Sequence, residues 1–208
     1  MVDPAVLPGY LLAVLLIVVA PGPDHAYIVA AATAYGPRAG VVSAGGMALG
    51  MVVHVTATAL GLAVLVTTVP WTLDVVRLAG AAFLGWQAVI TLRSARTAGL
   101  GRAAAGGRQV LRRATLTNLA NPKVILFFAA FLPHFVRPGH GPVTAQLLTL
   151  GLIFLLIGLV VDSAVGITAG RLGAALAAGG RAGTVLTVAA GLTFAALAVL
   201  LVADVVAG

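Results

Sequence analysis

The sequence contains no cysteine and no glutamate, and only 8% of its 208 residues are charged. Without cysteine, the chain has no disulfide framework, thiolate metal site or dithiol relay, which excludes membrane redox carriers that use paired cysteines. A soluble domain has about 25% charged residues. Here 61% of the residues are hydrophobic and the mean hydropathy is +1.14. The composition therefore predicts an integral membrane protein, with no cofactor.

The formal net charge of +7 would suggest nucleic-acid binding if the chain were soluble. The basic residues are eleven arginines and Lys123, and six of the arginines lie between Arg93 and Arg113. No aromatic residue on which a base could stack lies among them. We therefore interpret this stretch as a cytoplasmic loop and expect no nucleic-acid partner.

Apolar runs separated by Gly, Pro or Arg predict six membrane-spanning helices. Their approximate bounds are 7–35, 41–68, 72–92, 114–136, 143–169 and 183–206. No room remains for a second folded domain. We expect one transmembrane transporter domain over 1–208, with halves at about 1–92 and 114–208 joined by the Arg-rich loop 93–113.

Lysine and arginine are unevenly distributed over the predicted connections. One side has Arg38, the six arginines of the 93–113 loop, Arg171 and Arg181, whereas the other has Arg137, with Arg77 just inside a span. The positive-inside bias places the first side in the cytoplasm and both termini outside. Three spans per half make the second half inverted relative to the first, as in many secondary transporters. The predicted fold is all-α, with six transmembrane helices in two inverted three-helix repeats.

Prolines interrupt the first and the fourth predicted spans at corresponding places. The interrupting sequences are Ala20-Pro21-Gly22-Pro23-Asp24-His25 and Asn118-Leu119-Ala120-Asn121-Pro122-Lys123. Because proline removes a helical hydrogen bond and restricts the residue before it, we expect both helices to be broken near the bilayer centre. Bare backbone at that depth requires surrounding protein or a wet cavity, and paired breaks indicate a transporter's binding site.

The two breaks predict a site for a zwitterion. Pro23 and Pro122 suit the first positions of new half-helices, and Asn121 is a good cap. The free N–H groups of each new half-helix suit a carboxylate, whereas the free carbonyls of the preceding half-helix suit an ammonium group. Asp24 and Lys123 follow the two breaks as opposite charges. An amino acid carries both complementary groups.

Each charged residue also has a simpler interpretation. Asp24 could only stabilise the dipole of its half-helix, and the pair of Asp24 with Lys123 could be purely structural. Asp162, the other acid well inside a span, binds a proton or a polar substrate group, or only hydrogen-bonds a neighbouring helix. We treat Asp24 and Asp162 as the candidates for proton coupling.

The histidines and glycines give weaker signals. The chain lacks His-x-x-x-His and Glu-x-x-His pairs, so His25 and His54 predict no metal site. A lone satisfied histidine is the default, and His54 with Thr56 is a candidate lining of a pocket. We expect helix packing at three glycine pairs spaced four residues apart: Gly36 and Gly40, Gly46 and Gly50, and Gly166 and Gly170.

Several stretches of the chain together resemble the lysine exporter family, also called LysE/RhtB. In the first half they are Pro21 to Asp24, Tyr35 to Val41 and Gly46 to Gly50, and in the second half Leu78 to Leu84, Leu116 to Lys123 and Phe127 to Val136. The resemblance extends from about Leu15 to the last span. It implies a six-helix exporter of amino acids or related small metabolites in the bacterial inner membrane, driven by the proton gradient and not an enzyme.

The resemblance also implies which residues act on the substrate. Carried over by motif, the functional positions are Pro21, Gly22, Pro23, Asp24, Asn118, Asn121, Pro122 and Lys123. Phe83, Gln87 and His134 depart from the usual family residues, so lysine is not assumed as the substrate. The expected partners are a small-molecule substrate and membrane lipid, and a homodimer is compatible with the sequence.

Two other functions fit the sequence less well. An exporter of metal or inorganic ions with a similar inverted fold would use His25, His54 and the acids as ligands, but the lack of sulfur ligands and Glu argues against it. An intramembrane hydrolase would need a nucleophile beside a base, and no motif around Ser43 or Ser163 suggests one.

Overall fold

The computed structural model describes residues 2–20, 22–61, 106–177 and 182–207, together with positions 78, 81–82, 85–86, 88–89 and 92–93. Every regular element within these ranges is helical. This agrees with the all-α prediction from composition. Most of the predicted third span, 72–92, and much of the predicted loop 93–113 lie outside the described residues.

The first half begins with a short 3-10 helix, η1 (Pro4–Val6), which the side chain of Asp3 caps. It continues as α1 (Leu7–Val19), α2 (Pro23–Tyr35) and α3 (Pro37–Ala59). Each of these helices has proline at its first or second position. An N–H there has no acceptor within the helix, so proline, which lacks one, loses no hydrogen bond. Gly36 turns the chain between α2 and α3 with φ of 88°, which other residues rarely adopt.

The second half begins with α6 (Gly107–Leu119), earlier than the predicted start of the fourth span at 114. Val110, Ala114 and Thr117 are buried on one face of this helix, whereas Arg108 and Arg112 are exposed. Arginine is a good helix former whose long stem can hold its charge in water beside an apolar helix. The predicted end of the Arg-rich loop at 113 is therefore too late in the sequence, because the arginines near that end lie within a helix that begins at Gly107.

After a break, the chain forms α7 (Pro122–Leu126), a π-helix η2 (Phe127–Phe131) and a 3-10 helix η3 (Leu132–Phe135). The long helix α8 (Val143–Ala177) and α9 (Ala182–Ala207) complete the described chain. Their bounds agree with those of the predicted fifth and sixth helices, although α8 extends beyond the predicted end at 169. Its 35 residues correspond to about 50 Å of helix, longer than a hydrocarbon core of about 30 Å.

Two of the described helices are long and apolar enough to cross a membrane, Pro37–Ala59 and Val143–Gly173. Two further candidates are bent helix pairs: Pro4–Val19 with Pro23–Tyr35, bent by 51°, and Gly107–Leu119 with Lys123–Phe135, bent by 52°. Both predicted breaks are therefore present. The helices support a multi-pass membrane protein.

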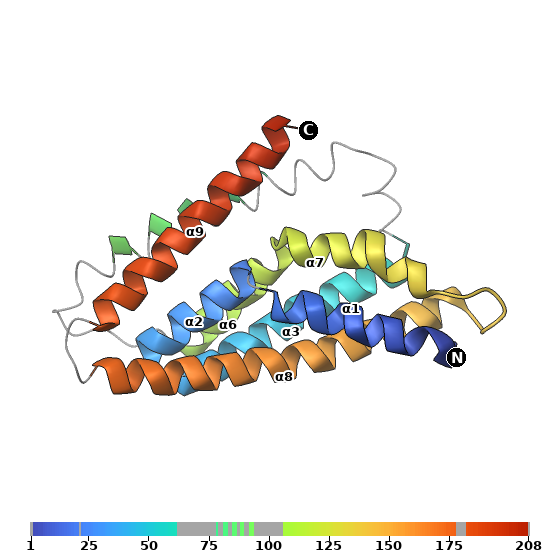
Figure 1. Ribbon diagram of the computed structural model, residues 1–208, viewed down its shortest axis with the longest axis horizontal. Coiled ribbons are helices and arrows are strands. Elements are labelled where there is room, and N and C mark those ends of the chain that lie inside the picture. Colours follow the sequence, from blue (N-terminus) through green and yellow to red (C-terminus); the bar gives the residue numbers. More distant parts are fainter. Residues whose placement is uncertain are drawn as a thin grey trace.

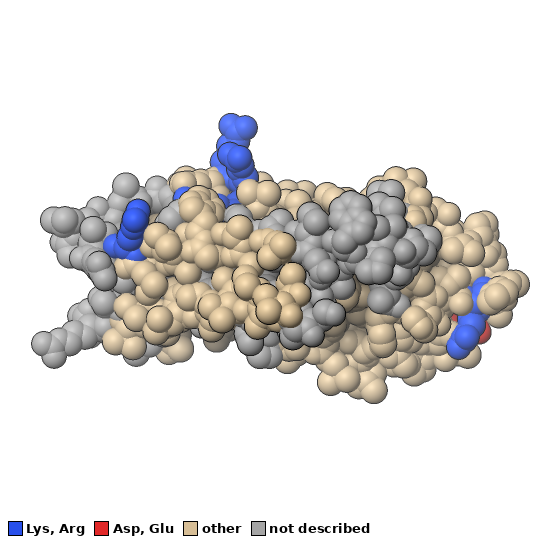
Figure 2. All heavy atoms as spheres, turned by 90° about the horizontal axis from the view of Figure 1, so that it is seen from above, with Lys and Arg blue, Asp and Glu red and all other residues tan. Residues whose placement is uncertain are grey.

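Most of the labelled helices lie along one long axis, whereas α9 is inclined to them (Figure 1). The pair α1 and α2 runs from the right end to the left, whereas α6 and α7 run from left to right, so the two broken pairs are antiparallel. In each pair the break falls in the middle of the molecule. On the face drawn in Figure 2, most of the described Lys and Arg atoms lie on the left half, and the right end has one basic patch beside an acidic one.

Glycines allow the central helices to approach closely. A Cβ on Gly40 of α3 would lie 2.6 Å from the Cα of Gly166 on α8, and one on Gly46 would lie 2.5 Å from the Leu111 carbonyl of α6. Such distances leave no space for any side chain. The packing prediction is confirmed at these positions but is wrong for Gly36, where a Cβ would meet nothing within 4 Å and the turn explains the glycine.

Candidate functional site

The first break lies between α1 and α2. α1 ends at Val19, Ala20 turns out of the helix with ψ of 128°, and Gly22 is extended at φ −164°. Pro23 starts α2, as predicted, and Asp24 lies in the first turn of α2. Pro21 lies outside the described residues.

The second break lies between α6 and α7. α6 ends at Leu119, and Asn121 is extended with φ of −82° and ψ of 109°. Its side-chain oxygen accepts a hydrogen bond of 3.1 Å from the backbone N–H of Lys123, so the predicted cap on the half-helix that Pro122 starts is confirmed.

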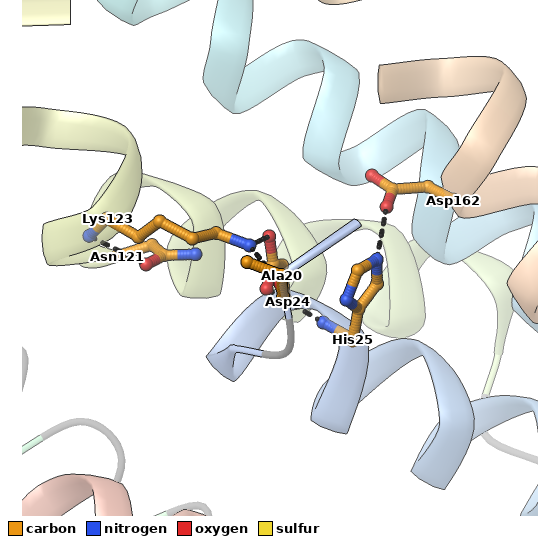
Figure 3. A network of polar contacts seen from close by, with 6 residues as sticks. All are labelled: Ala20, Asp24, His25, Asn121, Lys123 and Asp162. Carbon is orange, nitrogen blue, oxygen red and sulfur yellow. Dashed lines mark hydrogen bonds and ion pairs between the residues drawn. The ribbon is translucent and has the colours of Figure 1, made fainter. Parts of the chain in front are cut away.

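Lys123 joins the two breaks (Figure 3). Its ammonium nitrogen lies 2.9 Å from Oδ2 of Asp24 and donates a hydrogen bond of 2.9 Å to the carbonyl of Ala20. Ala20 directly follows the end of α1, so its carbonyl is one of the free groups that the sequence predicted to receive an ammonium. The predicted face-to-face arrangement of the acid and the amine is therefore observed. Both side chains are mostly buried, with 17% of Lys123 and 6% of Asp24 exposed.

The backbone at Gly22 packs directly against this ion pair. A Cβ on Gly22 would lie 2.8 Å from Oδ1 of Asp24 and 3.2 Å from the Lys123 nitrogen. Because φ at Gly22 is one that any residue adopts, the glycine is required for space and not for backbone freedom. Asp24 Oδ1 also accepts a hydrogen bond of 2.9 Å from the backbone N–H of His25 in the first turn of α2. Asp24 can therefore stabilise the dipole of its half-helix and pair with Lys123 at the same time.

Two buried asparagines at the second break have side-chain atoms without partners. Asn118 and Asn121 are both 0% exposed. Within the described part of the chain, both side-chain polar atoms of Asn118 and the Nδ2 of Asn121 make no hydrogen bond. Since buried polar groups nearly always have partners, these atoms indicate a place where a polar ligand or water binds.

His25 and Asp162 form a second close pair that sequence reasoning missed. The Nε2 of His25 lies 3.5 Å from Oδ1 of Asp162 on α8 (Figure 3). The sequence interpretation was a lone satisfied histidine. The available signal is that each residue is polar within an apolar span, but nothing in the sequence indicates that two residues 137 positions apart meet.

The two proposed lining residues on α3 differ in position. His54 is partly buried, with Nε2 3.3 Å from the Asn118 carbonyl and its ring stacked on Phe128 at 5.9 Å. Thr56 is exposed, and its hydroxyl donates to the Val52 carbonyl of its own helix. The structure brings His54 to the second break but not Thr56, because successive residues of a helix point about 100° apart.

A groove of about 730 Å³ between α1 and the α7–η2 segment reaches the ion pair. Its floor includes Lys123 and Ala20, and its walls are mainly the apolar side chains of Leu16, Ile17 and Phe127. Leu126, Phe131, His134 and Ala13 complete it. An apolar groove ending at convergent polar groups is the usual form of a small-molecule site. In the described ranges no three His or Asp side chains cluster as metal ligands would.

Similar proteins include named exporters. A homoserine/homoserine lactone efflux protein of Salmonella typhimurium is 31% identical over 80% of this chain and 81% of its own length. A leucine efflux protein of Klebsiella pneumoniae is 31% identical over 61% of each chain. An uncharacterised membrane protein of Pseudomonas aeruginosa is 34% identical over 71% of this chain and 72% of its own. No solved structure gives a significant match.

The model of one protein family matches residues 15–205, nearly the whole chain and both breaks. The names of the family and of the relatives point to transport and not to catalysis. Together with the two broken helices, this match shows that the chain belongs to the LysE type translocator family.

Proposed function

We propose that this protein is a secondary active exporter that binds a zwitterionic amino acid, or a small metabolite like one, between its two helix breaks. The substrate carboxylate binds the Lys123 ammonium, and the substrate ammonium binds Asp24 and the carbonyl of Ala20, which accepts from Lys123 when no substrate is bound. The observation that carries the proposal is the buried Lys123–Asp24 pair, 2.9 Å apart, at the meeting point of both breaks.

A zwitterion can replace this ion pair without leaving a charge unpaired. In the absence of substrate, Lys123 and Asp24 neutralise each other, which avoids the large penalty of an isolated buried charge. When the substrate enters, its carboxylate replaces Asp24 on Lys123 and its ammonium replaces Lys123 on Asp24. The unpartnered Nδ2 of Asn121, beside Lys123, offers a further hydrogen bond to the same ligand (Figure 3).

The groove beside the pair favours substrates with a short or apolar side chain. Its walls are mainly apolar, and Lys123 is the one cation among its lining residues. Two relatives are named as a homoserine/homoserine lactone efflux protein and a leucine efflux protein. Homoserine and leucine are both neutral amino acids at physiological pH, and we propose this class for the present chain.

The proposal includes an orientation and an energy source. Antiparallel broken pairs support two inverted repeats of three helices, with alternating access around a site at the middle. The arginines on the left half support a cytoplasmic face there, with the rest of the 93–113 loop, and termini outside the bacterial inner membrane. We propose that protons moving inward drive export, with Asp24 and Asp162 as the candidate carriers.

Transport by the purified protein in proteoliposomes tests the substrate site. We expect uptake of labelled homoserine or leucine into vesicles preloaded with the same amino acid, and a loss of this exchange in Asp24→Asn and in Lys123→Met. Asp3→Asn and Arg137→Met remove the same charges near the outer end of the molecule and should exchange as the wild type does. Exchange that is unchanged in both site variants would show that the site is wrong.

A further inference from the structure

Two pairs of ionisable side chains meet at the first turn of α2 (Figure 3). Asp24 faces α7 and binds Lys123, whereas the next residue, His25, faces α8 and approaches Asp162. The backbone N–H of His25 also donates a hydrogen bond to Oδ1 of Asp24. A change in either pair therefore acts on the same helical turn, which connects the substrate site to α8.

The His25–Asp162 pair is buried but held loosely. Their side chains are 14% and 3% exposed, and the closest nitrogen and oxygen atoms are 3.5 Å apart. Among the described residues, neither Nε2 of His25 nor Oδ2 of Asp162 has a hydrogen-bond partner. A structural pair would normally be shorter and fully hydrogen bonded, because unsatisfied polar groups are costly in a low dielectric.

The charges of the two pairs differ in a way that matters for coupling. Lys123 and Asp24 cancel, so with a neutral imidazole the four groups retain the negative charge of Asp162. A zwitterionic substrate has no net charge, so its binding leaves the net charge of the site at −1. One proton, on Nε2 of His25 or on a carboxylate oxygen of Asp162, neutralises it. The change of the buried site from outward-facing to inward-facing is less unfavourable when the site carries no net charge within the membrane.

We propose that His25 and Asp162 together form the proton site, separate from the substrate site at Asp24 and Lys123. This rests on the proposed function and assigns Asp24 to the substrate and Asp162 to the proton. A proton from outside binds the pair while the site faces outward, and the neutral pair allows the empty site to return. The proton is then released to the cytoplasm, which restores the negative charge of the pair, and the substrate is exported while the pair is in this deprotonated form.

Other ionisable groups around this pair have separate partners. Asp24 on α2 and Lys123 on α7 face it and are paired with each other. On α3, His54 contacts the Asn118 carbonyl, and on α6, Arg113 lies over the ring of Trp86. Tyr27, two residues further along α2 than His25, donates its hydroxyl to the Val110 carbonyl. Among the described residues, α1 contributes only the buried Tyr10, whose hydroxyl donates to the Leu150 carbonyl of α8.

Proteoliposomes with an acidic lumen separate the two functions. The wild type should accumulate labelled homoserine or leucine against its gradient and release protons from the lumen as it does so, which a trapped pH dye reports. His25→Gln and Asp162→Asn should lose this accumulation about tenfold or more, while substrate exchange without a pH gradient persists. The matched control is the pair of the exposed His140 and the half-buried Asp3, 3.8 Å apart, changed to His140→Gln and Asp3→Asn.

The outcomes distinguish the two proposals. Proton-driven accumulation that persists in both variants, or a loss of exchange together with accumulation, would overturn the separate proton site. A wild-type protein that exchanges substrate but moves no protons overturns it too, independently of how the variants fold, and leaves the exporter standing. A wild-type protein that transports no neutral amino acid refutes the proposed function itself.

Discussion

Lys123 and Asp24 depend on each other because both charges are buried at the same break. Removing one partner leaves the other charge uncompensated, which in folded proteins costs about 3–5 kcal/mol, whereas removing both leaves no buried charge. We therefore expect Lys123→Met to lower the melting temperature in detergent more than the double variant with Asp24→Asn. A double variant less stable than either single one would show that the pair does not hold this break together.

Gly22 is the residue at which the proposed substrate site has no spare space. Its Cβ in Gly22→Ala would lie 2.8 Å from a carboxylate oxygen of Asp24, so we expect the ion pair to shift and transport to fall about tenfold. Gly9→Ala in α1 is the control, since a Cβ there meets nothing within 4 Å. Equal exchange rates in both variants would show that the backbone at Gly22 does not position the pair.

At the scale of elements, α3 and α8 are held together by backbone contact. A Cβ on Gly166 would lie 2.7 Å from the backbone of Gly40, where no flexible side chain can move away. Gly166→Ala should destabilise the protein by about 1–3 kcal/mol, because the helices must separate. A melting curve in detergent checks this, with Gly9→Ala again as the control. An unchanged melting temperature in Gly166→Ala would contradict close packing at this crossing.

The breaks could be predicted from the sequence, whereas the contacts across them could not. Proline and asparagine act on their own helical turn, so Pro23, Asn121 and Pro122 predicted where half-helices start. The pairing of His25 with Asp162 depends on how α2 packs on α8. The π-helix at Phe127–Phe131 has no sequence signal that we recognise. It lies directly after α7, the helix that carries Lys123, and π-helical turns are frequent at functional sites.

At the scale of the whole molecule, the proposed orientation can be tested because the chain has no cysteine. Single cysteines introduced as Asp3→Cys and His140→Cys should react with a membrane-impermeant maleimide added to intact cells. Arg38→Cys and Arg171→Cys, at the opposite end of the bundle, should react only after the membrane is opened. The reverse pattern would invert the proposed topology, and labelling of all four from outside would contradict a spanning arrangement.

The sequence by itself determined the membrane environment, the positions of the helix breaks and the presence of opposite charges after them. These features follow from composition and from residues that act within one helical turn, so they need no knowledge of neighbouring helices. Only the tertiary structure decided that Lys123 reaches across to Asp24 and Ala20, that His25 faces Asp162, and that Thr56 points away. Side-chain contacts between helices depend on their rotation and crossing, which small residues such as Gly40 and Gly166 fix through packing.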